Sequence, residues 1–528
     1  MVWTSSRRNI LKAGLALGGM AVAGCGTSSG SDPAWESVTT PTPGGPTRGG
    51  VLRYGLSSEP TNFEPHVSSG TSADIVRQLV YNGLLAYDGN GEIVGDLAQD
   101  YGWVGRSTYK VRLRPGVRFH NGSPLTADDV VFSFRRILDP QVGGTARNLL
   151  SGVSSIDAID NNTVQFTLSD PDAGFPYALA SPTAMVVSEA WVESGVNPKT
   201  TAMGTGPFTL VERIPGVSIT LRGFDDYFDP ELPYLNAIVF SPMSDDYARV
   251  TALRAASVDI IDYVPATHID VVQRNPNLSF ASDRTFGFGW IGFVTDRPPF
   301  NDLRVRRAVA LGLDRESILR TAFLGHGEVI SGGLVPPAVA SYSDALRGSM
   351  TYDPDQARSL LKQAGYDRLP MPMLSTSAYS VISRPAEASL PGLREAGIDV
   401  EMQQQDWQSF RKSLSAKSFP THSWGARIAY GDPDALRDFV GSKGAYNNFN
   451  YSDDRVDWLL AQGRLTEDPA GRAEIYQDIE QRVLEALPLA YTVRREQGEA
   501  LHTYVKGFEH PKKGTWTQVS LRKVWIEQ

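Results

Sequence analysis

The stretch that decides the fold is Leu113-Arg-Pro-Gly-Val-Arg-Phe-His-Asn-Gly-Ser-Pro-Leu-Thr-Ala-Asp-Asp-Val-Val-Phe132. Apolar and polar residues alternate in the segment that enters it, Tyr109–Arg114, and again farther along in Thr163–Leu168. Alternation with a period of two predicts strands with one buried face, so we expect two half-exposed antiparallel strands. Between them, Thr126 with Asp129 three residues later is close to a capping box and predicts the start of a helix.

Helices and strands continue on both sides of this stretch, as the spacing of apolar residues indicates. A helix is predicted to open at Asp353, with Pro354 in its first turn, and to end at Gly365. The other predicted elements are strands over Gly50–Leu56, Phe208–Val211 and Ile398–Met402 and helices over Ala73–Tyr81, Asp302–Leu313 and Pro469–Ala486. Because strands and helices do not alternate strictly, we expect an α/β chain with α+β parts, built as lobes joined by several crossings.

The N-terminus has the pattern of an exported protein. The basic stretch Ser6–Lys12 precedes the apolar run Ala13–Gly24, which is too short to span a hydrocarbon core of about 30 Å. This order predicts a signal peptide over residues 1–24, and its paired arginines indicate the twin-arginine export route. A generic basic leader is the alternative, because Ile10 stands where phenylalanine is usual.

The apolar run ends in Val22-Ala-Gly-Cys25, which resembles the bacterial lipobox, where the cysteine is acylated and the chain is cut just before it. Cys25 is the only cysteine, so it serves no disulfide framework. We expect a lipid anchor at Cys25; an incidental cysteine in a discarded leader is the alternative. Residues 25–49 are rich in Ser, Thr, Pro and Gly and are predicted to form a flexible tether.

The rest of the chain is acidic. Arg7, Arg8 and Lys12 leave with the leader, so the net charge falls from −9 to −12. An acidic body argues against nucleic acid, whose phosphates need a basic face, and against anionic lipid except through the anchor. About 478 of the 528 residues follow residue 50, which is too many for one core, so two or three domains are expected.

The sequence contains almost none of the common catalytic and metal-binding patterns. The seven histidines include no pair at i, i+3 or i, i+4, which argues against a metal site of ordinary type. The sequence after the predicted tether has no Gly-x-Ser-x-Gly elbow; the match Gly26–Gly30 lies within the tether. The sequence has no Gly-x-x-x-x-Gly-Lys-Ser/Thr loop, and Pro207 removes a backbone donor from the glycine-rich segment Met203–Phe208. We therefore expect no catalytic residues, no metal and no cofactor, and a binding function rather than catalysis.

Longer motifs resemble those of the family 5 extracellular solute-binding proteins, the peptide, nickel and opine receptors of ABC importers. The segments Tyr81–Asp88, Gly91–Gln99 and Leu113–Phe132 carry the signature of that family almost unbroken. Further matching motifs are Gly204–Phe208, Phe224–Phe228, Pro298–Ala308, Asp314–Ile318 and Tyr352–Tyr366. The resemblance covers roughly residues 50–520.

The resemblance implies a two-lobed periplasmic-binding-protein fold, with a ligand cleft between the lobes and an extra α+β domain inserted in the first lobe. The implied boundaries are 50–75, 204–294 and 497–528 for lobe I, 76–203 for the inserted domain and 295–496 for lobe II. The implied hinge crossings lie near Ala202–Gly206, Phe293–Thr295 and Arg494–Gly498.

The resemblance also points to a ligand pocket. In peptide-binding members a segment Trp-x-Gly/Ala-Asp supplies an acid for the ligand's α-ammonium group, and here it reads Trp424-Gly-Ala-Arg427-Ile-Ala-Tyr-Gly-Asp432-Pro433. A cation at position 427 favours an anionic or neutral hydroxylated ligand over a peptide ammonium. Alternatively, Arg427 faces solvent and Asp432 takes the role of the acid. The other candidate ligand contacts are the aromatic residues Trp407, Trp424 and Tyr430, the amide of Asn447, and Arg384 as an anion contact.

Together these observations predict an extracytoplasmic solute-binding lipoprotein on the outer face of the cell membrane. We expect a monomer that delivers an oligopeptide or peptide-like solute to the permease subunits of an ABC importer. One alternative is a receptor for an anionic or neutral non-peptide solute, such as an opine, a sugar or a metal chelate. The others are a peptide-sensing or chaperone lipoprotein on the same fold and, last, a hydrolase.

Overall fold

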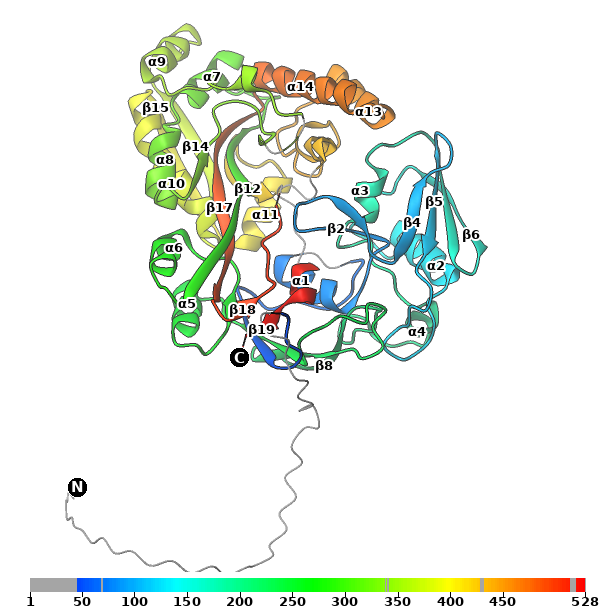
Figure 1. Ribbon diagram of the computed structural model, residues 1–528. Helices are drawn as coiled ribbons and strands as arrows, with labels where there is room; N and C mark the ends of the chain where they lie inside the picture. Colours follow the sequence, from blue (N-terminus) through cyan, green and yellow to red (C-terminus); the bar gives the residue numbers. More distant parts are fainter. Residues whose placement is uncertain are drawn as a thin grey trace, which may run out of the picture. The chain divides into compact units, whose positions relative to one another are not determined.

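Two long strands run side by side in the largest sheet (Figure 1). β12 (Leu278–Phe293) pairs antiparallel with β17 (Leu489–His502) over almost its whole length. The first of two register shifts between them lies between Asp283 and Gly287. An irregularity of this kind bends a strand and increases its local twist.

The computed structural model describes residues 45–67, 70–337, 339, 341–427, 432–512 and 519–527. The predicted signal peptide, Cys25 and most of the predicted tether lie outside these residues, as does Tyr430. No helix in the described ranges is long and apolar enough to cross a membrane.

The largest sheet among the described residues has eleven strands in the order β15-β14-β16-β12-β17-β11-β1-β10-β9-β8, with β13 also paired to β17. Its other strands are β1 (Val51–Leu56), β8 (Phe208–Ile214), β9 (Ser218–Gly223), β10 (Ala237–Pro242), β11 (Ile260–Ile261), β13 (Gly327–Val329), β14 (Leu369–Thr376), β15 (Ile398–Gln405) and β16 (Thr421–Arg427). The sheet is mixed: β1 is parallel to β10 and β11, and β14 is parallel to β15 and β16, whereas the central pairs are antiparallel.

The stretch quoted first lies in a separate four-stranded antiparallel sheet with the order β4-β5-β7-β6. Its strands are β4 (Ala98–Trp103), β5 (Thr108–Leu113), β6 (Val153–Asp160) and β7 (Thr163–Leu168). The predicted capping box is confirmed, since the backbone N–H of Thr126 donates to the Asp129 carboxylate at 3.0 Å and α2 (Ala127–Leu138) begins there. Two small sheets pair β2 (Leu85–Tyr87) with β3 (Ile93–Gly95) and β18 (Val505–Lys506) with β19 (Trp525–Ile526).

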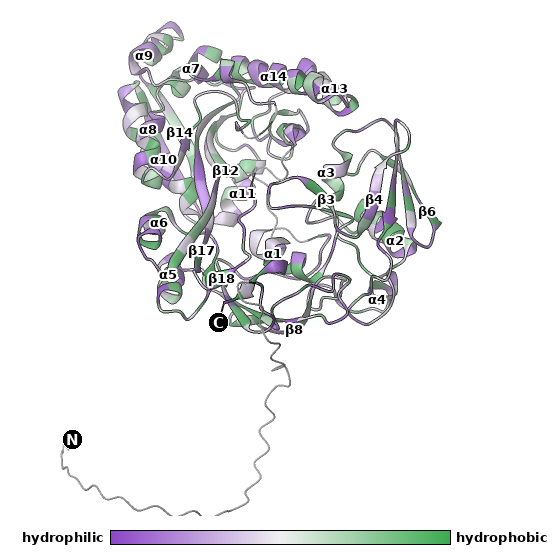
Figure 2. Cartoon of the chain, in the orientation of Figure 1, coloured by the Kyte–Doolittle hydropathy of each residue, from purple (hydrophilic) through white to green (hydrophobic). Residues whose placement is uncertain are grey.

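Most helices cover the edges and faces of these sheets (Figure 1). The remaining α-helices are α1 (Thr71–Val80), α3 (Phe175–Leu179), α4 (Glu189–Glu193), α5 (Asp246–Arg254), α6 (Ala266–Gln273), α7 (Leu303–Leu311), α8 (Arg315–Phe323), α9 (Pro354–Gln363), α10 (Ser380–Glu395), α11 (Trp407–Ser415), α12 (Arg437–Val440), α13 (Asp454–Leu465) and α14 (Pro469–Ala486). The 3₁₀ turns are η1 (Asp344–Leu346), η2 (Pro433–Leu436) and η3 (Val519–Lys523). Figure 2 shows both hydrophilic and hydrophobic residues on α13 and α14, as expected for helices with one packed face.

The buried apolar residues form clusters that follow segments of the chain. The largest cluster has all its members between Phe288 and Val493, and a second has its members between Leu84 and Met203, apart from Ala435. The other two combine residues of 52–81, 208–278 and 500–524 with Met185 and Val187. Leu278, at the start of β12, belongs to one of these last two clusters, whereas Phe288 and the apolar residues after it belong to the largest cluster. The hinge crossing expected at Phe293–Thr295 therefore lies after the point where β12 passes from one apolar cluster to the other.

A buried acid on α14 gives the fold a pH dependence. Glu480 is buried and its carboxylate accepts the backbone N–H of Val335 at 2.8 Å, close against Gly333. Burial raises the pKa of Glu480 from 4.5 to about 7, although the backbone N–H groups and Arg494 act in the other direction. Between these two pKa values the folded protein holds a proton that the unfolded chain has lost. The free energy of unfolding therefore falls as the pH rises through this interval.

We expect Glu480→Gln to remove this loss while keeping an acceptor for Val335. The Tm of the variant relative to the natural chain should therefore be higher at about pH 8 than at about pH 5, as measured by scanning calorimetry. Glu474→Gln, at an exposed position of the same helix, is the control and should shift Tm equally at both pH values. Equal shifts for Glu480→Gln as well would contradict the assignment.

Candidate ligand-binding site

Three neighbouring strands end at the same edge of the large sheet. β14 is parallel to β15, with Thr376 opposite Gln405, and parallel to β16, with Leu374 opposite His422. α10 connects β14 to β15 and α11 connects β15 back to β16, which lies on the other side of β14. In sheets of this kind ligands bind outside the carboxyl ends of strands, where connections leave in opposite directions.

The contacts of β16 show that α10 and α11 cover opposite faces of the sheet. The hydroxyl of Ser423 donates to the carbonyl of Ile382 in α10 at 3.3 Å. The next residue, Trp424, stacks on Phe410 of α11, with ring centroids 5.1 Å apart. Successive side chains of a strand point to opposite faces of the sheet, so α10 and α11 lie on opposite faces. Because each helix follows a strand end, the carboxyl ends of β14 and β16 lie between the N-terminal ends of α10 and α11.

An aromatic cluster lies at this edge. Trp407, the first residue of α11, has its ring centroid 5.8 Å from that of Trp424 and 4.7 Å from that of Tyr379. Trp424 is 5% exposed, whereas Trp407 is half-buried and Tyr379 is exposed. The cluster thus extends from the core to the surface and offers flat apolar faces at its outer end.

Polar groups at the same edge lack partners. The indole N–H of Trp424, the side-chain oxygen of Gln405 and the hydroxyl of Ser375 are buried without a hydrogen-bond partner among the described residues. An unsatisfied buried polar group costs about 1–3 kcal/mol, so such groups are uncommon in a protein interior. Three of them near the ends of adjacent strands are typical of a place where a further molecule binds.

A profile of the bacterial extracellular solute-binding proteins, family 5 (middle region), matches residues 92–448, more than half of the chain. The chain belongs to this family.

Several members of the family can be compared with this solute-binding protein over most of its length. The di/tripeptide-binding protein 1 of Pseudomonas aeruginosa is 27% identical, over 83% of this chain and 88% of that protein. The glutathione-binding protein GsiB of Escherichia coli is also 27% identical, over 80% of this chain and 84% of its own. The solved structure of AgaA from A. tumefaciens R10 in complex with agropinic acid is 34% identical, with a TM-score of 0.82 over 91% of this chain and 99% of AgaA. The two-lobed α/β fold implied by the sequence motifs is thereby confirmed.

Two of the predicted ligand contacts of this solute-binding protein lie together in the structure, and the side chains of two others lie outside the described residues. Trp407 and Trp424 share the aromatic cluster. Arg427 is the last residue of β16 and its backbone lies opposite Gly287 of β12; its side chain and Tyr430 lie outside what the structure describes. Arg384 lies exposed in the second turn of α10 and has no ion-pair partner among the described residues.

Asp432 of this solute-binding protein is held by an arginine. Its two carboxylate oxygens accept hydrogen bonds from both terminal nitrogens of Arg472 at 2.6 and 2.7 Å, and both side chains are largely buried. One of these oxygens also accepts the backbone N–H of Asp434 at 2.8 Å. This bidentate arrangement is the strong form of a charge-assisted pair, so the carboxylate has little capacity left for a ligand ammonium group.

The same segment joins two apolar cores. The carboxylate of the buried Asp434 accepts from the guanidinium of Arg464 at 2.9 Å, and the same guanidinium lies 3.5 Å from the carboxylate of Asp172. The backbone carbonyl of Arg464 accepts the backbone N–H of Ala173 at 2.8 Å. Burial alone would raise the pKa of Asp434, but its neighbouring arginines outweigh this effect and lower it. Ala435 packs in the cluster formed by residues 84–203, so this network connects that cluster with α13 and α14.

Asn447 supports a turn. Its amide donates to the carbonyls of Gly441 at 2.9 Å and Tyr451 at 2.7 Å, and its oxygen accepts weaker bonds from the backbone N–H groups of Phe449 and Tyr451. All hydrogen-bonding directions of the amide are used within the turn. Asn447 is a predicted contact only because of its aromatic neighbours, and no sequence signal shows that backbone groups satisfy its amide.

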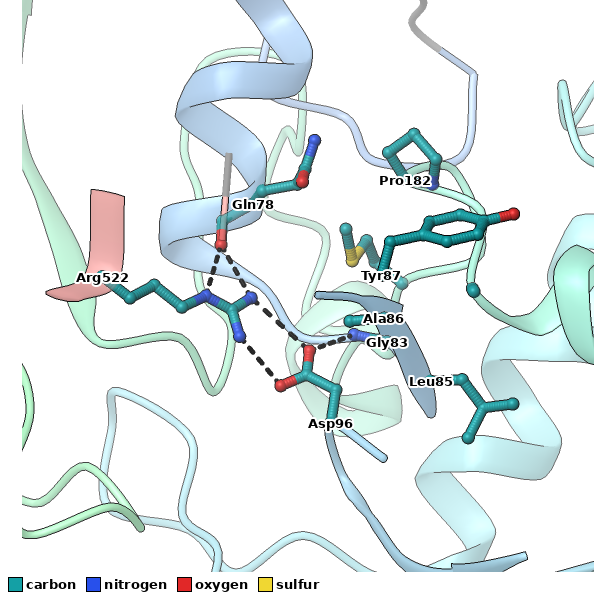
Figure 3. Close-up of a pocket in the computed structure, with 10 residues that line it drawn as sticks. Gln78, Gly83, Leu85, Ala86, Tyr87, Asp96, Pro182 and Arg522 are labelled. Atoms are coloured by element: carbon teal, nitrogen blue, oxygen red, sulfur yellow. Dashed lines mark hydrogen bonds and ion pairs between the residues drawn. The ribbon is translucent and has the colours of Figure 1, made fainter. Parts of the chain in front are cut away.

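A cavity elsewhere in the solute-binding protein is organised by an ion pair (Figure 3). Arg522 donates to Asp96 at 2.8 Å and to the backbone carbonyl of Gln78 at 2.8 and 3.1 Å. Asp96 also accepts from the amide of Asn82 and the backbone N–H of Gly83. With its carboxylate fully used, Asp96 holds the C-terminal segment against α1 and β2.

If Asp432 is structural, its removal must destabilise the protein. Asp432→Ala leaves Arg472 buried and unpaired, so we expect a loss of about 3–5 kcal/mol in the free energy of unfolding, measured in urea. Asp399→Ala removes the partner of Arg368 in a half-exposed pair and, as the control, should cost less than about 1 kcal/mol. A variant Asp432→Ala of natural stability would instead support a direct role in binding.

Proposed function

We propose that this protein captures a small solute outside the cytoplasm, most simply a peptide or peptide-like molecule, and delivers it to the permease of an ABC importer. The observation that carries the proposal is the family match over residues 92–448, together with relatives named for peptide and glutathione binding. In this proposal the protein is a monomer and not an enzyme. The solute occupies a cleft at the carboxyl ends of β14, β15 and β16, where hinge motion of two lobes encloses it.

A second candidate is an anionic, opine-type solute. Two features favour it: Asp432 is already paired with Arg472, and position 427 is a cation where peptide receptors are expected to have an acid. AgaA, with agropinic acid bound, is 34% identical over 91% of this chain. A ligand ammonium group would lack a free acid in this segment, whereas a carboxylate would find Arg427 within it.

The proposed division of the chain follows the motifs and the apolar clusters. Lobe I combines 50–75, 204–294 and 497–528, the inserted domain is 76–203, and lobe II is 295–496. The separate clusters of residues 84–203 and 288–493 support the second and third of these units. β17 (Leu489–His502) then contains the crossing at 496–497, and the crossing at 294–295 follows directly after the end of β12 at Phe293.

We further propose that the chain is exported by the twin-arginine route and anchored by a lipid at Cys25 to the outer face of the membrane. The paired arginines, the short apolar run and the single cysteine at its end support this location. Two or more acyl chains hold a protein firmly, since each buried CH₂ contributes about 0.8 kcal/mol. The acidic body adds no attraction to anionic lipid, so the anchor alone accounts for attachment.

The ligand charge can be tested at position 427. If Arg427 lines the cleft, Arg427→Asp should lower affinity for agropinic acid and raise affinity for the dipeptide Met-Leu, with a change of about tenfold or more in their ratio. Calorimetric titration of both solutes measures this ratio, and Arg427→Gln provides the neutral comparison. An unchanged ratio would place the side chain outside the cleft.

The anchor can be tested by cell fractionation. Cys25→Ser should move the protein from the membrane fraction to the soluble extracytoplasmic fraction. The double variant Arg7→Lys, Arg8→Lys should keep it in the cytoplasm, because the exporter reads the arginine pair as an address. Membrane association of Cys25→Ser, or normal export of the double variant, would contradict the respective assignment.

A further inference from the structure

We propose that Arg411 binds the carboxylate of the solute, which makes it a specificity residue of the site; this inference rests on the proposed function. Arg411 lies on α11 one turn after Trp407, and α11 begins directly beyond the carboxyl end of β15. One helical turn advances about 5.4 Å. The residue therefore lies at the same edge of the sheet as the aromatic cluster.

The guanidinium of Arg411 is positioned by two tryptophans. Its central carbon lies 5.2 Å from the ring centroid of Trp424 and 5.9 Å from that of Trp407. A cation over an indole is attracted by the electrons of the ring, by about 0.5–2 kcal/mol depending on solvation. Trp424 is itself fixed by stacking on Phe410, so the rings hold a long, flexible side chain in place.

Stacking leaves the donors of Arg411 available. A guanidinium contacts an aromatic ring through its flat face, whereas its N–H groups point outward in its own plane and match a carboxylate with two parallel hydrogen bonds. Among the described residues, no carboxylate lies within ion-pair distance of Arg411. By contrast, Arg437, Arg464 and Arg472 in the neighbouring segments each contact a buried aspartate.

A second donor supports the same ligand chemistry. The buried indole N–H of Trp424 has no acceptor in the described part of the chain, and this ring is the one that Arg411 covers most closely. A cation and an unpaired N–H on adjacent side chains suit an oxygen anion better than an ammonium group. The ligand class is therefore a small solute with a free carboxylate, which both a peptide C-terminus and an opine-type acid provide.

The experiment is calorimetric titration of the purified full chain with agropinic acid, glutathione, Met-Leu and the C-terminal amide of Met-Leu. The variants are Arg411→Gln, Arg411→Lys and Arg455→Gln. Arg455 is the matched control, because it stacks on Trp458 at 4.0 Å on the exposed face of α13. The melting temperature of each variant checks that it is folded.

We expect Arg411→Gln to weaken binding of the acid that the natural chain binds by about 10- to 100-fold and to reduce the salt dependence of Kd. Arg411→Lys should recover part of this loss, and Arg455→Gln should change nothing. Weaker binding of the Met-Leu amide than of Met-Leu would identify a peptide carboxylate as the group bound, whereas binding of agropinic acid alone would identify an opine-type acid.

Two results overturn the proposals separately. If the natural chain binds at least one acid and Arg411→Gln binds it equally well with the same salt dependence, Arg411 only packs on Trp424 and does not bind the solute, and the inference fails. If the natural chain binds none of the four probes, the proposed function fails, and the inference fails with it.

Discussion

The antiparallel pairing of β12 with β17 is the constraint on which the rest of the structure depends. Within the eleven-stranded sheet, β17 pairs with β11 on the side that leads to β1, and β12 pairs with β16 on the side that leads to β14. Their apolar side chains belong to different clusters at the two ends. The register shift between Asp283 and Gly287 lies between the β12 residues of these two apolar clusters. The two strands therefore connect the clusters, and the shift provides a place where the strands can bend.

The charged groups divide into those that hold the fold and those left for a ligand. Arg306 and Arg315 are buried and donate to backbone carbonyls at a helix end, in loops and in β17, which holds segments distant in sequence together. Burial lowers the pKa of Arg315 to about 10, and its carbonyl partners compensate part of the cost of desolvation. Asp432 and Arg472 belong to the same structural group. Arg411 differs, because its guanidinium lies over the rings of Trp424 and Trp407 and has no carboxylate partner among the described residues.

Local patterns predicted much of the fold because their causes are local. The predicted limits of α14 are those found, and Asp353 begins α9 by accepting the backbone N–H of Gln356. The site was less predictable because its contacts join positions far apart in the chain. Asp432 and Arg472 are 40 residues apart, and no sequence pattern links them. Arg411 has a weak signal, a cation four residues after a tryptophan, but only the packing of α11 on β16 places it over Trp424.

The central claim is that solute binds at the carboxyl ends of β14, β15 and β16. A crystal structure of the protein with bound solute tests it most directly. Ligand density is expected against Trp407 and Arg411, with a ligand carboxylate on the guanidinium. Density instead in the cavity of about 400 Å³ lined by Asp96, Arg114, Tyr227 and Arg522, with the aromatic cluster empty, would contradict it.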